Sequence, residues 1–322
     1  MRGLSKQFLD DLKSGVLMRL NDIVTNDETL CLEIRENSVD VYYRGGRLFN
    51  VKKGKNYELN FNEKYLNHGN KCKVEPLNTA LLKTMDDYLN AIPLLKREMD
   101  FKLKYNRKQE RESQQLILRE NNFGVVSRST DYYICDIEYA RKESNPISNV
   151  GEKNKPRFDM VGVKWMSKSL DRQNRKPISL ALFELKYGDN ALTGRSGIVK
   201  HFKDLDYFFS KGKHLELMDE AQTQFNQKYY LNLIDMKDNE EEKKHSCFFE
   251  KILIDPNIKP EYILIFANHD PDSSVLRTQL RIAIDTYPQL LDMVDIKIAR
   301  SSLMGYGLYA DHMVDIKDFL GL

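Results

Sequence analysis

Three short apolar segments in the middle of the chain constrain the fold most, because each has the length and composition of a buried strand. They cover residues 132–139, 158–163 and 180–186, and each carries acidic side chains within an otherwise apolar run. A helical pattern at 105–122 precedes them. A helix at 197–209, a strand at 262–267, a helix at 273–284 and a strand at 294–299 follow. This order predicts an α/β domain with a mixed sheet flanked by helices.

The first third of the chain has a different pattern. Apolar residues spaced three and four apart predict a packing helix over residues 4–20. Alternating segments at 30–34, 38–43, 48–51 and 57–61 predict an antiparallel β-meander, with Gly45-Gly46 as a hairpin turn. We therefore expect a smaller N-terminal α+β lobe over residues 1–95, used for recognition or for forming a homodimer, and an α/β domain over 96–322.

Composition excludes several classes of protein. No run approaches the ~20 apolar residues that cross a bilayer, and the N-terminus lacks the apolar core of a signal peptide, so we expect a soluble cytoplasmic protein without membrane contact. Cys31, Cys72, Cys135 and Cys247 lack the spacing of a zinc site. Phosphate-binding P-loops and the common hydrolase motifs are absent from the sequence.

Positive charge is concentrated in particular regions of the sequence and is not spread over the whole chain. The net charge is only +2, so contact with nucleic acid has to come from particular regions. One basic region lies between residues 96 and 111, where acidic residues are also frequent, and it is equally compatible with a solvated helix face.

One acid and one lysine share a face of the third strand. Side chains alternate along a strand, so Glu184 and Lys186 project together while Phe183 and Leu185 point the other way. Asp159 lies in the preceding strand, and a hairpin between the two strands through the polar loop 167–177 would bring all three groups to one end of the sheet. A buried ion pair with no further role is the alternative.

These residues, in this order of elements, resemble the PD-(D/E)XK nuclease superfamily, which has the restriction-endonuclease-like fold. Its core runs helix, three strands, helix, strand, with an aspartate on the second strand and the (D/E)-x-K motif on the third. The match covers residues 105–270, with Asp159 followed by Glu184-Leu185-Lys186; Phe158 replaces the proline before the aspartate.

The resemblance implies a metal-dependent nuclease. Mg²⁺, or Mn²⁺, would be held by Asp159, Glu184 and the Leu185 carbonyl, because hard cations prefer oxygen ligands. Asp159, Glu184 and Lys186 would be the catalytic residues, and Lys186 would stabilise the transition state. Many members add a glutamate from the first core helix, for which we expect Glu112, with Glu110 and Glu120 as alternatives.

The segment after the third strand is expected to contact the substrate backbone. Arg195 lies in a glycine-containing loop, and Lys200 and His201 lie near the start of the next helix, where free amide groups favour phosphate. A polar surface position is the alternative for His201. We expect a nuclease that acts on DNA. An RNA-cleaving enzyme and a nucleic-acid-binding protein without catalysis remain the alternatives.

Overall fold

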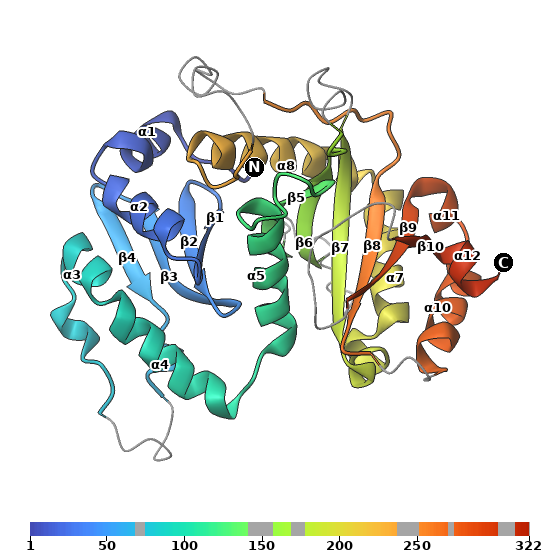
Figure 1. The fold of residues 1–322 in the computed structure, drawn as a ribbon, viewed down its shortest axis with the longest axis horizontal. Coiled ribbons are helices and arrows are strands. Elements are labelled where there is room, and N and C mark those ends of the chain that lie inside the picture. Colours follow the sequence, from blue (N-terminus) through green and yellow to red (C-terminus); the bar gives the residue numbers. More distant parts are fainter. Residues whose placement is uncertain are drawn as a thin grey trace, which may run out of the picture.

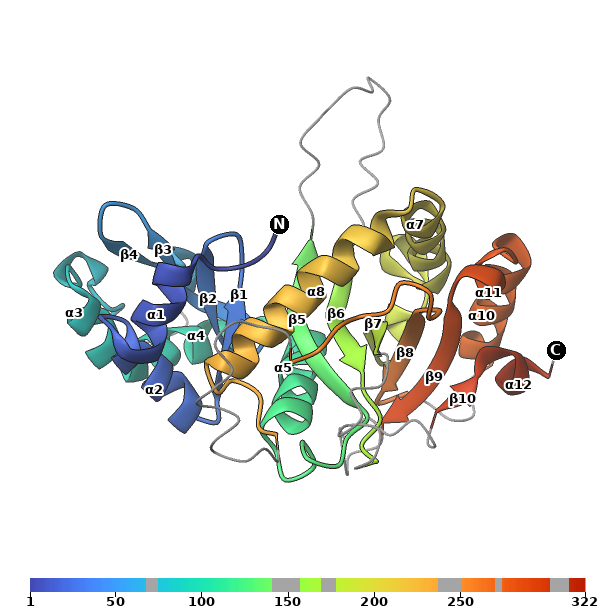
Figure 2. The same cartoon turned by 90° about the horizontal axis from the view of Figure 1, so that it is seen from above.

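The computed structural model describes residues 1–67, 75–140, 157–168, 178–236, 251–269, 274–301 and 313–321. These residues form two lobes, each built around its own β-sheet, which lie side by side in both views (Figures 1 and 2). The first sheet is the predicted antiparallel meander and the second is the predicted mixed sheet with helices beside it. The mixed α/β fold class is therefore confirmed. The loop at 169–177 and most of the charged segment after residue 236 lie outside the described residues.

The N-terminal sheet has the strand order β1-β2-β3-β4. Its strands are β1 (Leu30–Ile34), β2 (Ser38–Tyr43), β3 (Gly46–Lys53) and β4 (Tyr57–Phe61). The β2–β3 turn is shifted by one residue from the predicted one: Tyr43 pairs with Gly46, and the turn residues Arg44 and Gly45 have φ values of 49° and 69°. Gly45 is also required by packing, because a Cβ there would lie 2.2 Å from the backbone of Arg111.

Two helices replace the single one predicted over residues 4–20. Helix α1 (Lys6–Ser14) ends at Gly15, whose N–H donates to the carbonyls of Asp10 and Asp11, and α2 (Met18–Asn26) begins three residues later. A Cβ at Gly15 would lie 2.8 Å from the Asp11 Cα, so the close reversal of the chain needs glycine. Both helices bury apolar side chains in the same N-terminal core.

A long helix closes the N-terminal lobe. Short 3₁₀ turns at Glu63–Tyr65 and Thr79–Leu81 lead to α3 (Met85–Asn90) and α4 (Ile92–Tyr105). Leu95, Met99 and Leu103 of α4 pack into the N-terminal core, so the boundary predicted near residue 95 falls inside this helix. The second lobe begins with α5 (Gln109–Asn122).

The second sheet has the strand order β10-β9-β8-β7-β6-β5. Strands β5, β6 and β7 pair antiparallel, whereas β8 and β9 continue the sheet in parallel with β7. Their bounds are β5 (Tyr132–Ala140), β6 (Arg157–Lys164), β7 (Ser179–Tyr187), β8 (Glu261–Ala267), β9 (Asp295–Ser301) and β10 (Val314–Asp315).

Helices cover both faces of this sheet. Phe183 and Leu185 of β7 share a core with α5, while Leu180 and Leu182 share a core with α7 (Ile198–Ser210) and α8 (Lys213–Tyr230). Near the C-terminus lie α10 (Val275–Thr286), α11 (Leu290–Met293) and α12 (Ile316–Leu320). No helix in the described ranges is both long enough and apolar enough to cross a membrane.

Buried ion pairs join the two lobes. Asp136 of β5 binds both Arg2 and Arg35 from the N-terminal lobe. Glu33 of β1 binds the Lys228 Nζ of α8 over 2.7 Å, and Glu33 and Asp136 are fully buried. Paired charges of this kind are costly to separate, so the network fixes how the lobes meet.

Candidate active site

The candidate site begins where strands β6 and β7 separate. Their pairing extends from Lys164 and Ser179 to Met160 and Phe183 and stops there. Beyond that point the backbone N–H of Leu185 donates to Oδ2 of Asp159 over 2.7 Å. The side chain of Asp159 thus takes the place of a strand partner, which holds it beside the Glu184-Leu185-Lys186 segment.

Glu184 and Lys186 form a buried ion pair, as expected for two residues on the same face of a strand. Oε1 of Glu184 lies 2.6 Å from Nζ of Lys186, and their side chains are only 2% and 4% exposed. In contrast, Asp159 is partly exposed. The pair is therefore shielded from bulk water, while the aspartate beside it can be reached from solvent.

His201 of α7 completes this group. Its Nε2 lies 3.0 Å from Oε1 of Glu184, 3.0 Å from Nζ of Lys186 and 3.1 Å from the carbonyl oxygen of Ser196. With a proton on Nε2 the ring donates to an oxygen; without it, the ring accepts from Lys186. The sequence assigned His201 to substrate contact, whereas the structure places it in direct contact with the Glu184–Lys186 pair.

The helix glutamate beside the site is Glu110, and the expectation for Glu112 is corrected. Oε1 of Glu112 lies 2.7 Å from a guanidinium nitrogen of Arg44, so this carboxylate is directed to the N-terminal lobe. By contrast, the charge of Glu110 acts on both Asp159 and Lys186. Both glutamates lie in the first turn of α5, and because residues two positions apart do not share a helix face, only one of them can be directed to the site.

Glu138 is a further acid that the sequence analysis did not place in the site. It lies on β5 between the positions that pair with Phe158 and Met160, and its φ of 53° marks an irregularity in the strand. Burial raises the pKa of its carboxyl, and the charge of Glu184 adds to this effect, although Arg111 opposes it. The sequence signal that could have pointed to Glu138 was the presence of two acidic residues in the otherwise apolar segment 132–139.

Negative charge exceeds positive charge around Asp159. Desolvation, together with the charges of Glu184 and Glu110, raises the pKa of the Asp159 carboxyl well above its usual value, and Lys186 only partly offsets this. At Glu184 burial also opposes ionisation, but His201 and Lys186 outweigh it and lower the pKa. Burial favours neutral Lys186, yet Glu184 and Asp159 raise its pKa and keep it charged.

The donor set fits a hard divalent cation. Within the described ranges, no three His, Cys, Asp or Glu side chains already form a metal cage. However, the carboxylates of Asp159 and Glu184 lie beside Leu185, and a cation would offset the burial and the repulsion by Glu184 and Glu110 that raise the pKa of Asp159. Mg²⁺ needs few protein ligands because it retains several waters.

The two other predicted substrate contacts lie outside this group. Lys200 forms an ion pair with Asp204 along α7 and is 40% exposed. Arg195 lies in the exposed 3₁₀ turn Gly194–Ser196, just before α7. Contact between either residue and a substrate stays a prediction.

Comparisons with known proteins found no match to this chain, whether among protein-family models, curated proteins or solved structures.

Proposed function

We propose that this protein is a metal-dependent nuclease that hydrolyses phosphodiester bonds in DNA. One observation carries the proposal: Asp159 and the Glu184-Leu185-Lys186 segment meet where β6 and β7 separate, and the Leu185 N–H to Asp159 hydrogen bond joins them. The order α5, β5, β6, β7, α7, α8, β8 supports it, because with α8 as an additional helix it follows the order of the PD-(D/E)XK core that the sequence resembles.

Asp159, Glu184 and the carbonyl of Leu185 would hold Mg²⁺ or Mn²⁺. When bound, such an ion makes a coordinated water more acidic and neutralises charge on the phosphate. Glu110 and Glu138 add negative potential around the ligands and so favour a cation there. Mn²⁺ suits the same oxygen donors.

Lys186 supplies the fixed positive charge. Its ammonium stays protonated beside Glu184 and Asp159, so it can donate hydrogen bonds to phosphate oxygens as negative charge develops on them. His201 restrains the pair by contacting both partners. The burial of Glu184 and Lys186 excludes water from this side and strengthens their electrostatic effect.

A panel of substrates tests this function. The purified chain is incubated with single- and double-stranded DNA and RNA, each with Mg²⁺, with Mn²⁺ or with chelator, and the products are separated on a gel. We expect cleavage of DNA that chelator abolishes. Cleavage of RNA but not of DNA would show that the substrate is RNA and would overturn the assignment to DNA. The absence of cleavage in all arms, with binding retained, would instead favour a nucleic-acid-binding protein without catalysis.

A further inference from the structure

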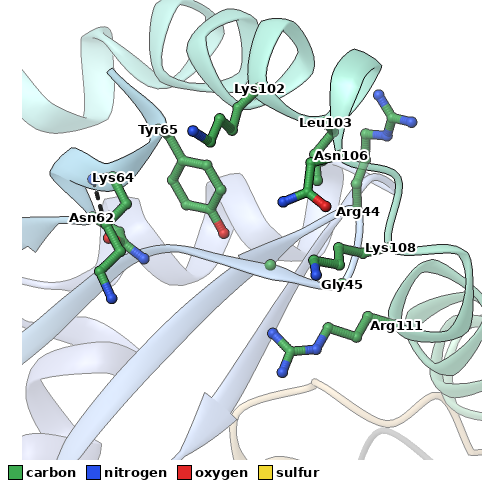
Figure 3. Close-up of a pocket in the computed structure, with 11 residues that line it drawn as sticks. Arg44, Gly45, Asn62, Lys64, Tyr65, Lys102, Leu103, Asn106, Lys108 and Arg111 are labelled. Carbon is green, nitrogen blue, oxygen red and sulfur yellow. Dashed lines mark hydrogen bonds between the residues drawn. The ribbon is translucent and has the colours of Figure 1, made fainter. Parts of the chain in front are cut away.

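A cavity of about 190 Å³ lies at the junction of the two lobes, outside the group around Asp159. It is bordered by the β2–β3 turn, by the 3₁₀ turn Glu63–Tyr65, by the end of α4 and by the start of α5 (Figure 3). The Gly45-Gly46 segment shapes its wall, since a Cβ at Gly46 would lie 2.4 Å from the Tyr65 hydroxyl oxygen.

The lining of this cavity is strongly basic. The eleven described residues around it include no aspartate or glutamate, and five of them are cationic: Arg44, Lys64, Lys102, Lys108 and Arg111. Figure 3 shows Lys108 and Arg111 reaching toward the hydroxyl of Tyr65, while the guanidinium of Arg44 turns away. We refer to this cavity as the basic pocket.

Among the residues that the structure describes, part of this positive charge has no acidic partner. Arg44 is paired with Asp100 and Glu112. Lys64 and Lys108 are exposed, and neither forms an ion pair within the described ranges; Lys102 donates only to the neutral carbonyl of Asn67. A concave surface with excess cationic donors attracts an anion.

The basic pocket and the candidate active site share one turn of helix. Arg111 lines the pocket, and the preceding residue, Glu110, lies in the field of Lys186 and Glu184. A guanidinium nitrogen of Arg111 lies 3.0 Å from the carboxylate of Glu138. The charge of Glu184 contributes to the raised pKa of that carboxyl. Arg111 therefore connects the pocket to Glu138, one of the acids near the candidate active site.

We propose that the basic pocket binds a phosphate group of the nucleic-acid strand that is cleaved. This inference rests on the proposed nuclease function. Lysine and arginine make charge-assisted hydrogen bonds to phosphate oxygens, and the tyrosine hydroxyl adds a neutral donor. Three residues of the basic region at 96–111, Lys102, Lys108 and Arg111, thus have a role beyond solvation.

The first test uses pyrophosphate and the full chain in chelator, with binding followed by calorimetry. The double variant Lys64→Ala/Lys108→Ala removes two exposed pocket charges, and Lys52→Ala/Lys55→Ala removes two exposed charges near the β3–β4 turn. We expect the parent to bind, the pocket variant to bind about tenfold more weakly, and the control to match the parent. Melting curves verify that both variants fold. A parent that does not bind, or equal losses in both variants, would overturn the pocket.

The second test identifies the source of the phosphate. A fluorescent single-stranded oligodeoxynucleotide is titrated in chelator at several salt concentrations. The slope of log affinity against log salt should fall by about 0.7 for each phosphate that is no longer contacted. The pocket variant, which loses the contact with one phosphate group, should therefore lose about 0.7 and the control nothing. Pyrophosphate binding that needs the two lysines, combined with an unchanged oligonucleotide slope, would assign the pocket to a small phosphate compound and overturn the strand assignment. Neither test involves cleavage, so a protein that passes both but never cuts would reject the nuclease function and keep the pocket.

Discussion

The backbone N–H of Leu185 donates to Oδ2 of Asp159 over 2.7 Å, where the pairing of β6 with β7 has ended. This bond ties the aspartate of one strand to the middle residue of the Glu-Leu-Lys segment on the next. It leaves the other carboxylate oxygen of Asp159 available. The separation of the strands therefore creates both the gap and the oxygen donors that a bound cation would need.

The first prediction separates the two glutamates of α5. Glu110→Gln should raise the metal concentration needed for half-maximal cleavage by about tenfold or more, as expected for a residue that tunes a metal site without necessarily being a ligand. Glu112→Gln is the matched control, because its partner is Arg44. The metal dependence of cleavage is measured for both variants. A larger effect at Glu112 than at Glu110 would reject the placement of Glu110 beside the site.

A second prediction concerns Asp136, which joins the lobes. Asp136→Asn leaves the half-buried Arg2 and Arg35 without their shared buried carboxylate and should lower the free energy of unfolding by about 3–5 kcal/mol in urea titrations. Asp86→Asn, which disrupts an exposed pair with Arg19, should cost less than about 1 kcal/mol. Comparable losses in both variants would show that the network does not fix the lobes.

Glu33 gives a prediction for pH dependence. Burial raises the pKa of its carboxyl to about 7, although Lys228 opposes the shift and nearby Asp136 adds to it. As pH rises, the carboxyl of Glu33 therefore loses its proton at a lower pH in the unfolded chain than in the folded one. The contribution of the carboxyl to stability is complete below the ordinary pKa of 4.5 and is lost as pH passes 7.

Urea titrations at pH 5 and pH 8 test this dependence. Between these pH values, Glu33→Gln should gain stability relative to the parent by up to about 3 kcal/mol. The exposed Glu58→Gln is the control and should show no such trend. A constant difference between Glu33→Gln and the parent at the two pH values would contradict the raised pKa of Glu33.

The fourth prediction concerns Gly162 in the centre of β6. A Cβ there would lie 2.3 Å from the carbonyl oxygen of Tyr133 and 3.1 Å from the ring of Phe183. Gly162→Ala should therefore cost about 1–3 kcal/mol through overpacking. At Gly54, by contrast, the nearest atoms would be 3.4 Å away, so Gly54→Ala should be close to neutral. Chemical unfolding of both variants measures the difference.

Local patterns in the sequence were sufficient for most strands and for α5, α7 and α10, because apolar residues recur there with regular spacing. Helix α8 was missed. Its buried face includes Gln224, Gln227 and Lys228, which bind the backbone of Ile34, the backbone of Leu4 and the side chain of Glu33 in the other lobe. A polar face buried by another lobe resembles a solvated face in the sequence.

The candidate site was likewise predictable only where local sequence patterns are sufficient. Glu184 and Lys186 follow from strand alternation, and their pairing needs no distant information. The choice between Glu110 and Glu112 depends on how α5 packs between the lobes, where Glu112 meets Arg44, which is more than sixty residues away in the sequence. The contact between His201 and Glu184 depends on how α7 packs on the sheet. Relationships of this kind arise only once the lobes and layers are assembled.

Cleavage by variants of the Glu184–Lys186 pair tests whether this pair is part of the active site. Glu184→Gln and Lys186→Met keep the size of each side chain, and each should reduce metal-dependent cleavage by about 10²–10³. Nucleic-acid affinity measured by gel shift should persist, because separate basic residues contact the backbone. The control is Lys164→Met, which breaks a similar pair with Glu261 at the opposite end of the sheet, where Nζ lies 2.7 Å from the carboxylate. We expect that only the first two variants lose cleavage while all three remain folded by circular dichroism. Full cleavage by a folded Glu184→Gln or Lys186→Met variant would contradict it.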